Sequence, residues 1–202
     1  MTSEEENTEL EILNAAKEVF QEKGMAGSRM QEIADKARIN KSMLHYYFRS
    51  KQLLFEAVFI NAFRLLAPQL NKVLNDDSEL FEKIRNFTNN YIAFVIVHPY
   101  LPNFVIQELN KNPDFIERLR SEKDFPSIEK FRIQVEEAIT LGVIKPIKAE
   151  QLFINIISLN VFPFIAAPLL RGLINTGEKE YSKMMERRKT EVADFIINSI
   201  RL

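Results

Sequence analysis

Two short helical patterns that follow each other closely over residues 28–51 constrain the fold of this chain more than any other feature. Ser28 and Gln31 form a Ser-x-x-Gln pattern, which predicts a capping box at the start of the first helix. Apolar residues then recur at helical spacing and predict its inward face: Met30, Ile33, Ala34 and Ala37.

A second short helix is predicted only a few residues later. Asn40 is a favoured N-cap residue, and Ile39 just before it can pack on Leu44 and fix the angle at which the chain enters the helix. Leu44 and Phe48 then predict the face that packs against the preceding helix. The opposite face is polar and aromatic and carries Lys41, Ser42, His45 and Tyr46.

Side chains of this outward face suit the surface of double-stranded DNA. Lysine and tyrosine reach phosphate oxygens, whereas Ser42, Met43 and His45 lie near the helix N-terminus, where base edges are met. Lys51 follows in the first turn of a helix that Ser50 would cap, and a helix N-terminus favours phosphate. The predicted DNA-contacting residues are Ser28, Arg29, Asn40, Lys41, Ser42, Met43, His45, Tyr46, Tyr47 and Lys51.

Charge is distributed unevenly along the chain, although its net charge is only -1. Residues 23–51 carry seven lysines and arginines against Glu32 and Asp35, which leaves a local charge of +5. Taken alone, such a run is more often a solvated face than a binding surface. Together with the two helical patterns, it favours a patch that binds phosphate.

The run from Ile39 to Lys51 closely resembles the recognition-helix signature of the tetracycline-repressor (TetR) family of bacterial transcription regulators. The upstream residues that fit this pattern are Ile12, Ala16, Phe20, Gly24, Gly27, Ile33 and Ala34. Three positions depart from it, because Arg38 and Ser42 stand where the family usually has glycine, and His45 where it has tyrosine. Either Arg38 adopts an unusual backbone angle or the turn differs. The DNA sequence preference of this chain is to be sought at these positions.

Composition fits an intracellular regulator. The 202 residues are 46% hydrophobic, enough for a substantial core in one or two small domains. No cysteine is available for disulfides or metal binding, and residues 1–11 are polar and acidic, unlike a signal peptide. Polar residues and prolines interrupt the most apolar run, residues 152–170, which favours a buried helix over a membrane span. We expect a soluble, cytoplasmic protein that does not bind membranes.

Features required for catalysis are scarce. Of the two histidines, His45 lies on the predicted DNA-contacting face, and His98 precedes a proline where a capping or surface role is favoured. The five glycines include no phosphate-binding loop, and neighbouring carboxylates such as Glu136 and Glu137 diverge on a helix. No cluster of metal ligands stands out. We therefore expect no enzymatic activity, no metal and no cofactor.

Helical patterns continue through the rest of the chain, so the predicted fold is all-α. We expect an N-terminal three-helix helix-turn-helix DNA-binding domain over residues 1–51 and a C-terminal helical domain for effector binding and dimerisation over residues 52–202. A long fourth helix after Ser50 would link the two. Further helices are predicted at about 80–98, 100–110, 114–121, 126–141, 148–171 and 179–201.

The last two predicted helices are unusually apolar. The TetR resemblance implies that they pair with those of a second subunit as a four-helix bundle, and packing within one subunit is the alternative. A two-fold dimer doubles the DNA site and separates its half-sites by about one helical turn, roughly 34–36 Å, or a multiple of it. A homodimer through these two helices is therefore expected.

Aromatic residues are concentrated between residues 87 and 131. The resemblance implies a pocket here for a small apolar or amphipathic effector, and such sites combine apolar walls with a few polar groups. The predicted ligand-binding residues are Tyr91, Phe94, Phe104 and Gln107. Aromatic residues at helical spacing are more often part of the core, which is the alternative for each of them.

Together these expectations describe a ligand-responsive DNA-binding transcriptional regulator. It would act as a repressor that binds a pseudo-palindromic operator as a homodimer and is released by a small molecule. Two alternatives remain open. The regulator would respond to a protein partner and not to a small molecule, or the chain would be a helical interaction module that no longer binds DNA.

Overall fold

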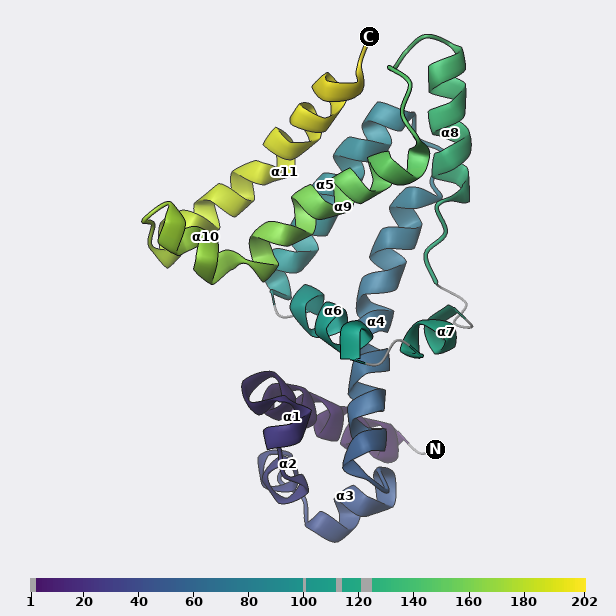
Figure 1. Ribbon diagram of the computed structural model, residues 1–202. Helices are drawn as coiled ribbons and strands as arrows, with labels where there is room; N and C mark the ends of the chain where they lie inside the picture. Colours follow the sequence, from purple (N-terminus) through teal and green to yellow (C-terminus); the bar gives the residue numbers. More distant parts are fainter. Residues whose placement is uncertain (1–2, 100, 112–113, 121–124) are drawn as a thin grey trace. The chain divides into compact units, whose positions relative to one another are not determined.

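The computed structural model describes residues 3–99, 101–111, 114–120 and 125–202 (Figure 1). These residues form α-helices and no strand, and an isolated antiparallel bridge joins Ile144 to Arg201. The expected all-α fold is thereby confirmed for the described part of the chain. Two compact units are present, and their boundary lies between Arg64 and Leu65 inside one long helix.

The first unit contains α1 (Ser3–Gly27), α2 (Met30–Lys36), α3 (Lys41–Tyr47) and the first half of α4 (Lys51–Leu74). Helix α2 packs against both α1 and α3. Each helix contributes apolar side chains to one core, which includes Ile12, Ala16, Val19, Phe20, Ile33, Ala34, Leu44, Leu54, Phe55, Val58 and Phe59. The rings of Phe20 and Phe55 meet edge to face, with their centroids 5.0 Å apart.

Side-chain caps begin the third and fourth helices, as predicted. The Asn40 Oδ1 accepts a hydrogen bond from the backbone N–H of Met43 at 2.7 Å. The Ser50 Oγ accepts one from the N–H of Leu53 at 3.1 Å. Each bond satisfies a donor that has no partner within its helix, so both helix starts are determined locally.

The capping box predicted for Ser28 and Gln31 does not form. Helix α2 has Arg29 as its N-cap residue, without a side-chain cap. The Ser28 hydroxyl instead donates to the carbonyl oxygen of Met25 at 2.8 Å, and the Gln31 amide donates to the Asp35 carboxylate at 2.7 Å. The Ser28 side chain therefore serves the end of α1, whose last carbonyls lack helical donors.

Arg38 lies in the turn between α2 and α3 with a φ of 57°. This left-handed conformation favours glycine, because a side chain at such an angle collides with the neighbouring carbonyl. Of the two possibilities raised by the missing glycine, the structure has the first: Arg38 adopts the unusual backbone angle. The turn keeps its geometry at the cost of local strain.

The second unit contains the end of α4 and seven further helices among the described residues. They are α5 (Leu80–Val97), α6 (Leu101–Lys111), α7 (Phe115–Arg120), α8 (Glu129–Thr140), α9 (Ala149–Ile165), α10 (Ala167–Leu173) and α11 (Glu178–Ile200). Helix α5 packs most extensively against α11 and also contacts α8 and α9 (Figure 1). Its buried residues, including Ile84, Phe87 and Val95, occupy the centre of this unit's core.

The single helix predicted over residues 148–171 is wrong, because two helices occupy this stretch. Helices α9 and α10 meet at Ala166 and are bent by 79° relative to each other. Pro168 lies in the first turn of α10, where its missing N–H and fixed φ are tolerated, and it restricts the residue before it. The apolar run therefore folds back on itself.

Two stretches are long and apolar enough to cross a membrane by composition, namely Lys51–Lys72 of α4 and the bent pair α9–α10. Core helices of globular proteins meet the same criterion. In the first unit, α4 buries Leu54, Phe55, Val58 and Phe59 against its neighbours, as a core helix does.

Candidate functional site

Helix α3 is divided into a buried side and an exposed side. Leu44 is fully buried and Phe48, at its C-cap, is 8% exposed, which anchors the helix in the first unit as predicted. On the other side Lys41, Ser42 and His45 are exposed, Met43 is 37% exposed, and Tyr46 is 77% exposed. A short helix thus offers a cation, a hydroxyl, an imidazole and a phenol on one surface, groups that can bind phosphates and base edges.

Two other predicted residues of this helix are more constrained. The Asn40 side chain is exposed, but its Oδ1 is engaged in the N-cap, which leaves the amide NH2 as its free donor. Tyr47 is partly buried, and its ring lies edge to face with Tyr46 at a centroid distance of 5.5 Å. The Tyr47 ring therefore helps to orient the exposed ring of Tyr46.

The basic patch of residues 23–51 is partly neutralised within the unit. Lys23 pairs with Glu32, and Lys36 pairs with Glu18 at 2.7 Å, so two of the seven cations are compensated. Four exposed cations have no ion-pair partner among the described residues: Arg29, Arg38, Lys41 and Arg49. These four carry the uncompensated charge that a polyanion would meet.

Lys51 has a structural role that the sequence did not indicate. Its ammonium donates to the backbone oxygen of Ser28 at 3.0 Å and lies 3.5 Å from that of Ala26. The first residue of α4 thereby holds the segment between α1 and α2. One of its donors remains for a phosphate, since an ammonium carries three.

The structure removes Ser28 from the predicted DNA-contacting residues and adds Arg49 to the candidates. Ser28 is only 3% exposed and its hydroxyl is bound to Met25, so its side chain is not at the surface. Arg49 was not predicted, although it is exposed and directly follows the Phe48 cap of α3. Its position between the Phe48 C-cap and the Ser50 cap was the available signal, because a residue in a short connection between two helices usually lies at the surface.

The four predicted effector residues occupy different environments. Tyr91 is 4% exposed and stacks on Phe87 at 5.7 Å, and burial raises the pKa of its hydroxyl. Phe94 is partly buried with its ring 4.7 Å from that of His98, and Phe104 is partly buried as well. Gln107 is exposed and donates to Asn103 at 3.2 Å. Tyr91 is therefore a core residue, while Gln107 lies at the surface.

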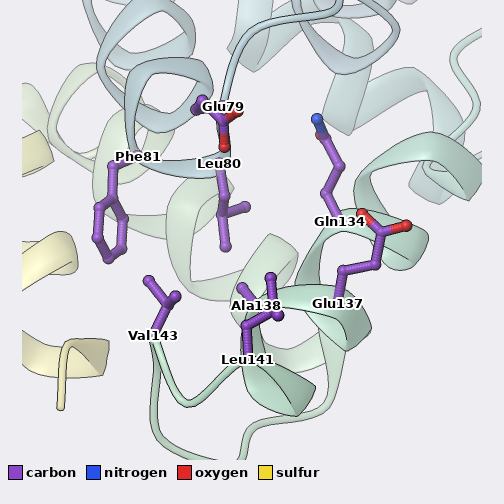
Figure 2. A pocket seen from close by; sticks show the side chains of 8 residues that line it. All are labelled: Glu79, Leu80, Phe81, Gln134, Glu137, Ala138, Leu141 and Val143. Carbon is purple, nitrogen blue, oxygen red and sulfur yellow. The ribbon is translucent and has the colours of Figure 1, made fainter.

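A cavity of about 200 Å³ opens between the start of α5 and the end of α8 (Figure 2). Leu80, Ala138, Leu141 and Val143 give it apolar walls, and the carboxylates of Glu79 and Glu137 lie at its edge. None of the four predicted effector residues lines it. Its acidic edge would disfavour anions and suits a cationic group.

Part of this chain is similar to a known family of proteins. Residues 12–58 match the family described as "Bacterial regulatory proteins, tetR family". The chain is similar to the HTH-type transcriptional repressor NicS of Pseudomonas putida, with 26% identity over 142 residues that cover 67% of this chain and 59% of NicS. It is also similar to the HTH-type transcriptional regulator RutR of Escherichia coli, with 45% identity over 47 residues that cover 23% and 22% of the two chains.

The matched stretch thus spans less than two thirds of either relative. Among solved structures, a TetR transcriptional regulator from Chloroflexus aurantiacus superposes with a TM-score of 0.69 at 21% identity and covers 100% of both chains. This likeness shows that the fold extends over the whole length, whereas the match to the family model is confined to residues 12–58. Residues 12–58 thus match the tetR family of bacterial regulatory proteins, and the fold of the whole chain is similar to that of a TetR transcriptional regulator.

Proposed function

We propose that this chain is a DNA-binding transcriptional regulator, a repressor that places α3 in the major groove of its operator. One observation carries this proposal: α3 buries Leu44 completely while exposing Lys41, Ser42, His45 and Tyr46. A helix held in this way by its apolar side can enter a groove about as wide as itself without unfolding.

Within this surface the cations and the polar side chains have different roles. Arg29, Arg38, Lys41 and Arg49 contact phosphates and provide affinity for any sequence. Ser42, Met43 and His45 meet base edges and provide sequence preference. Tyr46 and Tyr47 contribute hydroxyls toward the backbone, and Lys51 positions the segment around Ser28 in addition to its phosphate contact.

The regulator acts as a homodimer in the bacterial cytoplasm and responds to a small effector bound in the second unit. A single short helix reads few base pairs, so two copies are needed for a specific site. Phe162 on α9 and Phe195 on α11 are 54% and 64% exposed, which supports pairing through these helices. The effector must favour a state in which the two copies of α3 no longer match the operator spacing.

A footprint on the promoter of the chain's own gene tests the proposal. We expect two protected half-sites on one face of the DNA, with centres about 34–36 Å apart or a multiple of that distance. The matched control is the Leu44→Lys variant, which removes the anchor of α3 and should abolish protection. An absence of protection by the unmodified protein, even at low salt, would contradict DNA binding. Protection of a single half-site would contradict the dimer.

A further inference from the structure

A second cavity, of about 250 Å³, lies where α9, α10 and α11 meet. Its walls are mainly apolar and come from Pro163, Leu170, Ile174, Tyr181, Met184 and Met185. Three charged residues of α11 also line it, namely Arg187, Arg188 and Glu191. None of these residues belongs to the predicted effector set or to the cavity of Figure 2.

Arg188 has no ion-pair partner among the described residues, although the Glu191 carboxylate on the same helix acts on its charge at longer range. Its guanidinium Nη2 donates to the carbonyl oxygen of Leu159 at 2.7 Å, and its Nε is buried without a hydrogen-bond partner among the described residues. Burial lowers the pKa of the guanidinium, which indicates that its charged form is poorly solvated. By contrast, Arg171 on α10 lies 3.8 Å from Glu178. No carboxylate within the described residues pairs with Arg188.

Helix α10 forms one apolar wall of this cavity without being buried itself. None of its residues is buried in the unit, although it carries Leu169, Leu170 and Leu173. Leu170 and Ile174, the residue at its C-cap, reach the cavity. Since apolar surface left in water is unfavourable, a ligand with an apolar body would stabilise this helix against α11.

We propose that this cavity binds an amphipathic monocarboxylate, whose carboxylate pairs with the guanidinium of Arg188 and whose apolar body packs between α10 and Met184. An arginine guanidinium matches a carboxylate through two parallel hydrogen bonds, and a recessed position strengthens them. Methionine side chains adapt to apolar bodies of different shape, so the site selects a class of ligand more than one compound.

This site would identify the chemical class of the proposed effector. Only the expected change in DNA affinity on ligand binding rests on the proposed function. A carboxylate bound here bridges α11 and α10, the helix that follows the bend at Ala166. Ligand binding itself is a property of the second unit and is measured without DNA. Failure of the footprint and failure of ligand binding are therefore separate outcomes.

Calorimetric titration of the full chain with octanoate, 1-octanol and octylammonium tests the charge requirement. We expect octanoate to bind at least about tenfold more tightly than 1-octanol, and octylammonium to show no binding, because only the carboxylate compensates Arg188. Equal affinity for octanoate and 1-octanol would overturn the role of Arg188. Absence of octanoate binding would overturn the site as a whole.

Variants locate the binding in this cavity. Arg188→Gln removes the cation, and Ile174→Trp fills the cavity while leaving Arg188 in place, so each should weaken octanoate binding about tenfold or more. Lys179→Gln is the matched control, since it makes the same charge change at an exposed residue of α11 that does not line the cavity, and it should leave the affinity nearly unchanged. Unchanged binding by Ile174→Trp, or an equal loss in Lys179→Gln, would overturn the assignment.

The same samples are examined by analytical ultracentrifugation, because a second copy of the chain is the competing occupant of α10. We expect Ile174→Trp to keep the oligomeric state of the unmodified protein. If octanoate does not bind and Ile174→Trp dissociates the protein into monomers, a second copy covers this surface and the proposal is wrong.

Discussion

Arg188 donates from its guanidinium Nη2 to the carbonyl oxygen of Leu159 at 2.7 Å. Leu159 precedes Pro163 by four residues within α9, so this carbonyl is the one that a proline nitrogen leaves without its helical donor. Nearby, the Tyr181 hydroxyl donates to the carbonyl oxygen of Pro163 itself at 2.7 Å, close to the end of the same helix. Two polar groups of α11 thus replace hydrogen bonds that α9 cannot make alone.

Replacing Arg188 with methionine should lower the free energy of unfolding by about 2 kcal/mol, because the Leu159 carbonyl loses its donor while part of the packing is retained. The loss should shrink in a Pro163→Ala background, where the alanine N–H can restore the helical bond. Urea unfolding of the two single variants and the double variant measures this coupling. Strictly additive effects would contradict the relationship between Pro163 and Arg188.

Arg38→Gly should stabilise the first unit by about 1 kcal/mol, since glycine adopts a φ of 57° without the strain that a side chain causes. Arg38→Ala is the control, because it removes the same charge but keeps a Cβ at this angle. Thermal unfolding of both variants separates the backbone effect from the charge. Equal melting temperatures for the two would show that the turn is not strained.

Lys41→Ala should weaken binding to every DNA sequence and reduce the slope of log affinity against log salt by about one, because one phosphate contact is lost. Fluorescence anisotropy over a range of salt concentrations measures both quantities. Ser42→Ala removes no charge and should keep the slope while changing the preference among operator variants. A salt slope unaffected by Lys41→Ala would exclude α3 as the phosphate-contacting helix.

Lys51→Ala combines two effects, since the Lys51 ammonium also binds the carbonyl oxygen of Ser28. We expect lower DNA affinity together with a lower melting temperature of the first unit, whereas Lys41→Ala should change the affinity alone. Lys179→Ala, a matched change on α11, should alter neither. Lower affinity of Lys51→Ala at an unchanged melting temperature would show that the tie to Ser28 contributes nothing.

Asp76 and the buried Lys83 make part of the stability depend on pH. The Lys83 ammonium is 2.8 Å from the Asp76 carboxylate and also donates to the backbone oxygens of Leu74 and Asp76. Burial alone would raise the pKa of the Asp76 carboxyl, but hydrogen bonds from Lys83 and Ser78 outweigh it and hold this pKa below its ordinary value. The charged carboxylate is therefore the form that the folded protein favours.

Because the Asp76 pKa is lower in the folded state than in the unfolded state, the charged carboxylate stabilises the folded protein. This stabilisation is fully present above the pKa of the unfolded state, about 3.9, and is lost as pH falls through the pKa of the folded state. The stability difference between the unmodified protein and Asp76→Asn should thus be constant near neutrality and shrink in acid below about pH 4. Urea unfolding at several pH values measures it. Asp77→Asn removes a fully exposed carboxylate that pairs with Lys130, and because such surface pairs contribute little in water, its effect should be much smaller at any pH. The same profile for both variants would exclude Asp76 as the source.

Phe195→Glu should convert the proposed homodimer into monomers and lower operator affinity, because it places a charge on the exposed apolar face of α11. Light scattering after size-exclusion chromatography measures the mass directly. Leu141→Glu makes the same kind of change at a residue that is 77% exposed outside these helices, and it should leave the mass unchanged. Dimers that persist in Phe195→Glu would show that another surface joins the subunits.

Local signals in the sequence determined the first unit. Asn40 and Ser50 cap their own helices, and Ile33, Ala34 and Leu44 are buried where their helical spacing placed them. Such features involve residues a few positions apart, so they can be recognised without knowing the rest of the chain. The exposed face of α3 followed directly, because it is the side opposite Leu44.

Other features were decided only by contacts between residues far apart in sequence. Ser28 is buried and Lys51 ties down its carbonyl, so neither behaves as its neighbourhood in the sequence suggested. The bend at Ala166 and the two bonds from α11 that complete α9 arise where separate helices meet. The unpaired charge of Arg188 likewise depends on what is packed around it. Local patterns set where helices begin and which side is apolar, whereas burial and hydrogen-bond partners belong to the assembled unit.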